Sequence, residues 1–101
     1  MTRAVLSRAV DAGPGAFLST VELRGVRSGG RFGGWEVLSF DPRYQGAGVE
    51  VGDVIVRVNG RSLERPDDLS ALWQVLRDAP ELVFEVKRGG APAIVRVPVL
   101  E

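Results

Sequence analysis

Residues 47–60 read AGVEVGDVIVRVNG, and this stretch decides the fold of the chain. Gly52 takes a positive φ at no steric cost, so it predicts a sharp corner in the backbone. We expect the Asp53 carboxylate to fix this corner by accepting hydrogen bonds from backbone amides just downstream.

The segment after the corner has the alternation of a strand. Three valines alternate along residues 54–58 on one face, and Ile55 and Arg57 fall between them on the other. Asn59-Gly60 follows directly and predicts a type I′ hairpin turn, which needs positive φ at both central residues. The stretch therefore predicts a corner, a strand and a tight hairpin in that order.

The order A-G-(x)3-G-D-V-I-(x)2-V-N-G across these residues resembles the signature of bacterial PDZ domains. The fold that this resemblance implies is α+β and mainly β, a small antiparallel β barrel or sandwich capped by two helices. The function that it implies is binding of another protein's peptide or surface, with no chemistry of its own.

Apolar spacing predicts two helices outside this stretch. The first covers residues 2–12, with Thr2 as its N-cap, and the Gly-Pro-Gly sequence at 13–15 ends it. The second begins at Pro66, a residue suited to the first helical position, and stops before residues 78–80. Its apolar stripe consists of Leu69, Leu72, Trp73 and Leu76, and we expect Trp73 to belong to the core.

Alternating apolar runs between turn residues predict the strands. They are expected at residues 17–26, 32–40, 53–58, 82–87 and 94–99, with a brief pairing of residues 61–63. Pro92 and Pro98 indicate that the last strand lies at an edge of the sheet. This order of elements also favours a small antiparallel barrel or sandwich.

The composition predicts one small packed domain, residues 1–101, because 45% of the residues are hydrophobic. The net charge is zero, so nothing in the composition points to nucleic acid or to an acidic membrane surface. No apolar run approaches the ~20 residues that span a bilayer, and we expect no membrane contact by this domain. Residues 100–101 resemble residues left by cloning, which suggests a domain excised from a longer protein.

The residue types present exclude the common catalytic sites. The chain has no His and no Cys, so it offers no imidazole base, no Ser–His–Asp triad, no thiolate and no disulfide. The helix dipole and plain solvation explain Asp67, Asp68 and Glu81 better than acid–base chemistry does, and Lys87 is expected on an outward strand face. We therefore expect no enzymatic activity, no metal site and no cofactor.

The PDZ resemblance also implies where a ligand would bind. PDZ domains bind a peptide as an extra strand between a sheet edge and the second helix, and a Gly-hydrophobic-Gly-hydrophobic loop before that edge strand holds the ligand carboxylate. The matching segment here reads FGGW at 32–35, so its first two residues are reversed. Its two glycines retain the physics of a small anion nest, although a plain hairpin turn with Trp35 packed inward is the alternative.

The predicted peptide-binding residues are Arg31, Phe32, Gly33, Gly34, Trp35, Glu36 and Val37 on the strand side, with Leu72 and Val75 on the helix side. Helical projection leaves open whether the flank of Asp68 or that of Trp73 faces the groove. We expect Gly34→Asp to weaken ligand binding and to leave the fold intact.

A narrower resemblance is to the PDZ region of the inner-membrane C-protein of type II secretion systems. It rests on a helix, a strand, a glycine turn at 28–30, a Gly-aromatic strand at 34–38, and the basic residue-Gly pair Arg88-Gly89. This resemblance implies a periplasmic domain of an inner-membrane-anchored protein, whose partners are the secretin, other secretion subunits or exported proteins. The alternatives are a regulatory PDZ domain of a periplasmic or membrane-embedded protease, and a structural PDZ domain whose groove is filled by Phe32 or Trp35.

Overall fold

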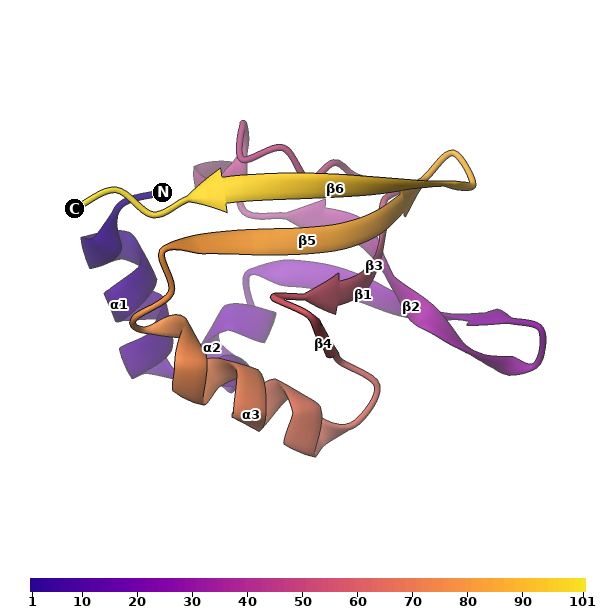
Figure 1. Cartoon of the computed structure of the whole chain (residues 1–101), viewed down its shortest axis with the longest axis horizontal. Helices are drawn as coiled ribbons and strands as arrows, with labels where there is room; N and C mark the ends of the chain where they lie inside the picture. The colour runs from indigo at the N-terminus through magenta and orange to yellow at the C-terminus, as the bar shows by residue number, and fades with distance from the viewer.

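The computed structural model describes all 101 residues, and Figure 1 shows its elements. The helices are α1 (Arg3–Ala12), α2 (Pro14–Leu18) and α3 (Pro66–Leu76), with a short 3₁₀ turn η1 (Pro42–Tyr44). The strands are β1 (Val21–Ser28), β2 (Arg31–Phe40), β3 (Val54–Val58), β4 (Arg61–Ser62), β5 (Glu81–Arg88) and β6 (Ala91–Pro98). The expected α+β, mainly β architecture is confirmed.

A single antiparallel sheet organises the molecule, with strand order β1-β2-β3-β5-β6 and with β4 paired to β3. The helices gather on one side of this curved sheet, and the β1–β2 hairpin projects away from the body (Figure 1). The two chain ends lie together, where Thr2 pairs with Leu100. The edges of the sheet are β1 and β6, so the edge position predicted for the last strand is confirmed.

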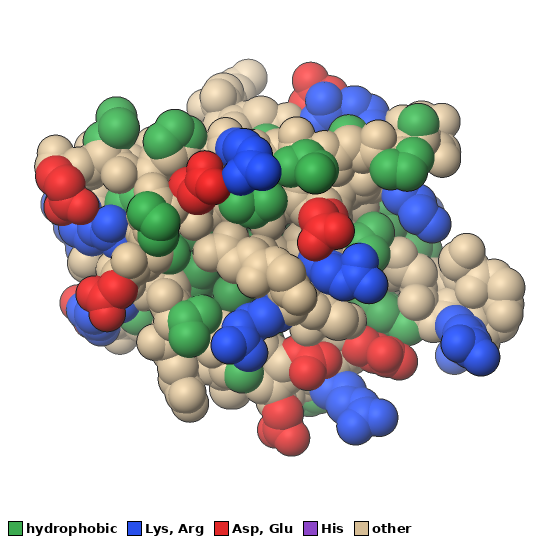
Figure 2. Space-filling model, in the orientation of Figure 1, with side chains coloured by type: hydrophobic (Ala, Val, Ile, Leu, Met, Phe, Trp, Pro, Cys, Tyr) green, Lys and Arg blue, Asp and Glu red, His purple; other side chains and the backbone are tan.

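The core lies between the sheet and helices α1 and α3. Its buried cluster consists of Leu6, Val58, Leu72, Leu76, Leu82, Val97 and Val99. Burying each such side chain contributes roughly 1.5–3 kcal/mol, so the row of Leu72 and Leu76 fixes α3 against the sheet. On the face drawn in Figure 2, charged and apolar side chains are interspersed.

The corner before β3 forms at Gly52, whose φ is 96°, as predicted. Asp53 is only 1% exposed, and its carboxylate accepts from the Glu50 N–H at 2.9 Å. The expected downstream partner is therefore wrong, because the loop folds back onto its own preceding residues. Arg88 of β5 donates to the same carboxylate at 2.9 and 2.8 Å, and this pairing holds the pKa of Asp53 below its ordinary value.

The set of β3 side chains that face the core differs from the simple alternation that the sequence predicts. A register shift between Ile55 and Arg57 places a bulge at this point of the β3–β5 ladder. Ile55 lies opposite the buried Val86 and packs on the same core as Val58, so the prediction that Ile55 and Val58 lie on opposite faces is wrong. The hairpin turn is confirmed, since φ is 49° at Asn59 and 77° at Gly60.

The first strand begins later than expected, because Phe17 lies in the additional helix α2 and β1 starts at Val21. Pro14 stands in the first turn of α2, where its fixed φ favours a helix. The hydroxyls of Ser19 and Thr20 donate to the last carbonyl groups of this turn, each at 2.6 Å. The 13–15 sequence therefore separates two helices and does not end helical structure.

Candidate functional site

A large apolar cavity extends through the interior of the molecule and reaches β1, α2 and α3. Strand β1 pairs with β2 alone, so its other edge has no strand partner. Residues of β1, α2 and α3 line the same cavity of about 1150 Å³, and 27 of its 34 lining residues are hydrophobic. From β1 they include Val21 and Leu23. An unpaired strand edge beside an apolar cavity is a place where an extended chain can add.

Helix α3 contributes Leu69, Leu72, Trp73 and Leu76 to the lining of this cavity. Leu72 is 3% exposed and belongs to the core cluster, whereas Leu69 and Trp73 are half-buried. Val75 is 43% exposed and does not line the cavity. Leu72 on the flank of Asp68 and Trp73 on the opposite flank both line the cavity, so the lining does not decide which flank faces a ligand.

The Trp73 side chain also carries an unusual polar atom. Its indole Nε1 is the one buried side-chain nitrogen or oxygen in the chain that has no hydrogen-bond partner. The Trp73 ring packs on Phe17 of α2 at a centroid distance of 5.4 Å, and Phe17 contacts Tyr44 at 5.8 Å. Buried N–H groups nearly always find an acceptor, so this unpaired indole N–H is unusual.

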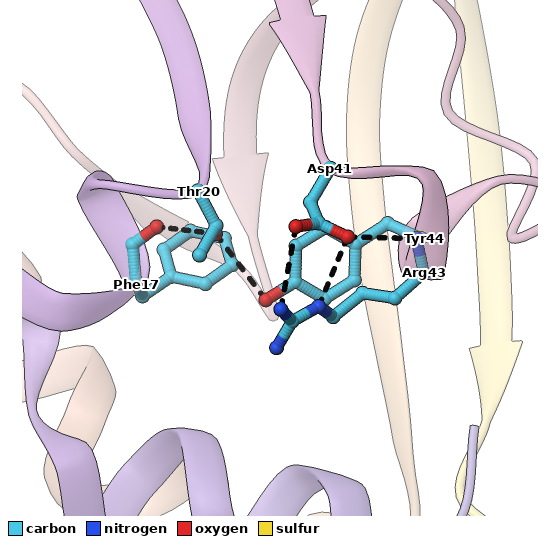
Figure 3. Close-up of polar contacts among 5 residues, drawn as sticks. All are labelled: Phe17, Thr20, Asp41, Arg43 and Tyr44. Atoms are coloured by element: carbon cyan, nitrogen blue, oxygen red, sulfur yellow. Dashed lines mark hydrogen bonds and ion pairs between the residues drawn. The ribbon is translucent and has the colours of Figure 1, made fainter.

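Several polar residues lie together beside the start of β1. Thr20 precedes β1 directly, and its hydroxyl lies 3.3 Å from that of Tyr44 (Figure 3). Asp41 accepts from Arg43 Nε at 3.0 Å and from Arg43 Nη2 at 3.3 Å, and Thr20, Arg43 and Tyr44 all line the cavity. The Arg43 N–H and then its side chain hold the pKa of Asp41 below its ordinary value.

The residues predicted to form the strand side of the groove lie in β2, which is not an edge. Trp35 pairs with Gly25 of β1 on one side and with Ile55 of β3 on the other. The expectation that this segment borders a free edge is therefore wrong, because β1 occupies that position. Phe32 and Trp35 form an edge-to-face pair at 5.3 Å, and Trp35 donates to the Leu63 carbonyl at 2.8 Å.

The two glycines of this segment do not form an open loop. Gly34 is buried with φ at 131°, and a Cβ there would lie 2.6 Å from the Ile55 carbonyl oxygen. A Cβ on Gly33 would lie 3.1 Å from that of Ser28. These glycines allow close approach of neighbouring strands, so the expectation that Gly34→Asp spares the fold is wrong.

The predicted site is thus only partly assembled. Trp35, Val37 and Leu72 line the cavity with the unpredicted β1 residues. Arg31 and Phe32 lie at the projecting hairpin, and Glu36 forms an ion pair with Arg24 of β1. The positions that sequence reasoning missed are Phe17, Thr20, Val21, Leu23, Arg43 and Leu69. The sequence signal for the boundary between α2 and β1 is the pair Ser19-Thr20, which follows an apolar turn that begins with Pro14.

The comparisons with known proteins bear on the fold. No family model and no curated protein sequence matches the chain. Among solved structures, the PDZ domain of EpsC from Vibrio cholerae matches with a TM-score of 0.63 and 24% identity, covering 93% of this chain and 98% of its own. A second structure of that domain matches at TM-score 0.60 and 27% identity, over 78% of this chain and 93% of its own.

The chain has the PDZ fold. The PDZ domain of the pullulanase C protein of the Klebsiella pneumoniae type II secretion system, solved in complex with fatty acid, matches at TM-score 0.59 and 20% identity over 85% of this chain and 91% of its own. The HtrA3 PDZ domain bound to the phage-derived ligand FGRWV matches with a TM-score of 0.54 and 26% sequence identity, over 78% of this chain and 80% of its own. The PDZ resemblance that residues 47–60 carry is confirmed.

Proposed function

We propose that this PDZ domain is a non-catalytic peptide-binding module and that its ligand lies between β1 and α3. The observation that carries this proposal is the unpaired edge of β1 beside an apolar cavity that Leu69 and Trp73 also line. A peptide added there gains main-chain hydrogen bonds from β1, and its alternate side chains enter the cavity. An antiparallel ligand strand ends beside Thr20, where β1 begins.

The residue types support a binding role over a catalytic one. The chain has no His and no Cys, so general-base and nucleophilic catalysis by these residues are not available. The lining of the cavity is mostly hydrophobic, which suits apolar ligand side chains.

The type II secretion C-protein is the parent that we propose. The likeness to EpsC covers 93% of this chain, so the matched part includes residues of the N-terminal helix region. The pullulanase C likeness covers 85% of this chain. The domain would then act in the periplasm on an inner-membrane-anchored protein and bind secretion subunits or exported proteins. The HtrA3 likeness supports the alternative, a regulatory PDZ domain of a protease. No helix of the chain is long and apolar enough to cross a bilayer.

A charge placed in the groove tests the proposed function. The ligands are peptides with free C-termini, selected from a library built around FGRWV. Their affinities for the wild type and for Leu69→Glu are measured by fluorescence anisotropy. We expect at least a tenfold loss of affinity, since a buried carboxylate without a partner costs well over 1.4 kcal/mol. Leu69 lies outside the core cluster, so the thermal midpoint should change little.

The matched control is Gln74→Glu, which adds the same charge on the exposed face of α3. It should bind the selected peptides as the wild type does. Equal affinity of Leu69→Glu and wild type, or a library that yields no binder, would contradict the proposed groove.

A further inference from the structure

A second, smaller cavity lies beside the later part of β1, where the β1–β2 hairpin leaves the body of the molecule (Figure 1). Its volume is about 410 Å³, and β1, β2 and the loop before α3 supply its lining. The residues of this hairpin pocket are Gly25, Val26, Arg27, Phe32, Trp35 and Glu64. Trp35 and Glu64 also line the large apolar cavity, so the two spaces are neighbours beside the unpaired edge of β1.

Gly25 is the residue of β1 that leaves room in this pocket. It pairs with Trp35 across the β1–β2 ladder, and a Cβ on Gly25 would lie 3.5 Å from Trp35 Cζ3 and 3.8 Å from Phe32 Cε1. These are ordinary contact distances, and the φ of Gly25 is not positive, so neither packing nor backbone conformation requires glycine here. Its effect is that two half-buried rings border an exposed strand position that has no side chain.

The hairpin pocket also carries one charge of each sign. Arg27 and Glu64 are both exposed, and no ion pair of the chain includes either of them. Arg27 Nη1 donates to the Gly30 carbonyl at 3.3 Å, which holds the guanidinium at the hairpin turn. Phe32 lies opposite Arg27 in the ladder and packs edge-to-face on Trp35 at 5.3 Å. The lining therefore combines two rings, a guanidinium and a carboxylate.

An aromatic side chain matches this lining better than a charged one does. The face of an aromatic ring is electron-rich and its edge is electron-poor, so the face suits a guanidinium and the edge suits a carboxylate or the face of another ring. A ligand cation is attracted by Glu64 and repelled by Arg27, and for a ligand anion the signs are reversed. The two charges therefore give no net preference for a charged ligand side chain.

The binding mode proposed above brings one ligand residue to this pocket. In a strand added antiparallel to β1 with its last residue opposite Val21, the fifth residue from that end lies opposite Gly25. Directly opposite residues of antiparallel strands place their side chains on the same face. The side chain of this ligand residue therefore points to the face on which Trp35 lies across from Gly25.

We propose that the hairpin pocket binds an aromatic side chain at the fifth residue from the ligand end beside the start of β1. The inference rests on the proposed function, because only a ligand strand along β1 places that residue. The ring contacts the benzo edge of Trp35, whose Cζ3 and Cε3 are the indole atoms nearest Gly25. The Trp35 indole N–H keeps its bond to the Leu63 carbonyl.

A thermodynamic cycle between the ligand ring and the pocket tests this proposal. FGRWV, whose first residue is the fifth from its end, and AGRWV are titrated by calorimetry. We expect the wild type to prefer FGRWV about tenfold, as for partial burial of one ring. Gly25→Val fills the space beside Trp35 with a residue that suits a strand, so the preference should fall to about twofold while AGRWV binds as before.

The charge of Arg27 is tested in the same cycle. Arg27→Met retains an extended side chain and removes the cation, so the preference for FGRWV should fall to about threefold. Arg61→Met is the matched control, because Arg61 is also an exposed strand residue outside every ion pair, and it lines neither cavity. We expect its FGRWV-to-AGRWV ratio to equal that of the wild type.

Three further peptides distinguish a ring from other side chains. LGRWV has apolar bulk without a ring and should bind about threefold more weakly than FGRWV. KGRWV and EGRWV should also bind more weakly than FGRWV. Equal affinities for FGRWV and LGRWV would overturn the aromatic assignment, and so would tighter binding of KGRWV, which would indicate a cation site at Glu64.

The outcomes separate this inference from the proposed function. Equal affinities of the wild type for FGRWV and AGRWV, with both still weakened by Leu69→Glu, would overturn the pocket and leave the groove standing. A preference for FGRWV that persists in Gly25→Val would place the ring elsewhere and also overturn the pocket. Absence of binding by all five peptides would refute both.

Discussion

At the scale of single residues, Gly52 has the simplest energetic role. Its φ of 96° turns the chain into β3, and no atom lies within 4 Å of a Cβ built there, so the requirement is conformational and not steric. Gly52→Ala should therefore lower the free energy of unfolding by about 1–2 kcal/mol, measured by denaturant titration. Gly15→Ala, at a helical position with equal space, is the control and should not destabilise. Equal stability of the two variants would contradict the corner.

The Asp53–Arg88 pair predicts an asymmetry between its two partners. Arg88→Met leaves a carboxylate that is 1% exposed with only the Glu50 N–H, and it should cost about 3 kcal/mol. Asp53→Asn should cost less, because the side chain of Arg88 is 41% exposed and remains solvated.

The same pair predicts a pH dependence. Arg88 lowers the pKa of Asp53, so the pair contributes stability above the unfolded pKa of about 4, and this contribution is lost as the pH falls through the folded pKa. In Arg88→Met, burial raises the pKa of Asp53. The difference in the free energy of unfolding between wild type and Arg88→Met should therefore become smaller below about pH 4. Thermal midpoints from pH 7 to 3 measure the gap, and a constant gap would show that the pair is not linked to folding.

Local chemistry made some residues predictable and left others hidden. The turns at Gly52 and at Asn59-Gly60 are predictable because these residue types are the ones that adopt the positive φ such turns need. Asp53 was expected to fix the corner, but its partner Arg88 lies 35 positions away, and no local pattern pairs them. The close approach that makes Gly34 necessary also comes from another strand, β3.

At the scale of elements, periodicity predicts those helices and strands whose own sequence carries a clear apolar pattern. Helix α3 has an apolar stripe and a proline at its start, and it forms as expected at Pro66–Leu76. Strand β1 was misjudged, because the apolar residues Phe17 and Leu18 fit a strand as well as a one-turn helix. The bulge in β3 depends on its register with β5, which the sequence of β3 does not encode.

The strand side of the predicted site was assigned to an interior strand for a related reason. The choice of edge strand depends on the order of strands in the sheet, a non-local property. The FGGW segment matches the expected loop in composition, but β1 covers the strand that contains it. Once the sheet order is known, residues 19–20 are the segment that precedes the edge strand β1.

At the scale of the whole molecule, the groove arises from elements that are distant in sequence. Leu72 and Leu76 fix α3 to the sheet, and they line, together with Leu69 and Trp73, a cavity that β1 also borders. The net charge is zero and the face in Figure 2 carries charges of both signs, so long-range steering is weak. Specificity is therefore expected from the shape of the cavity.

The most direct test of the groove is an amide chemical-shift titration of the domain with FGRWV bearing a free C-terminus. We predict saturable shifts along residues 20–26 and along α3, together with movement of the Trp73 indole N–H signal while that of Trp35, bonded to Leu63, stays in place. Shifts confined to the hairpin at residues 29–36, or an unchanged spectrum at millimolar peptide, would contradict the account.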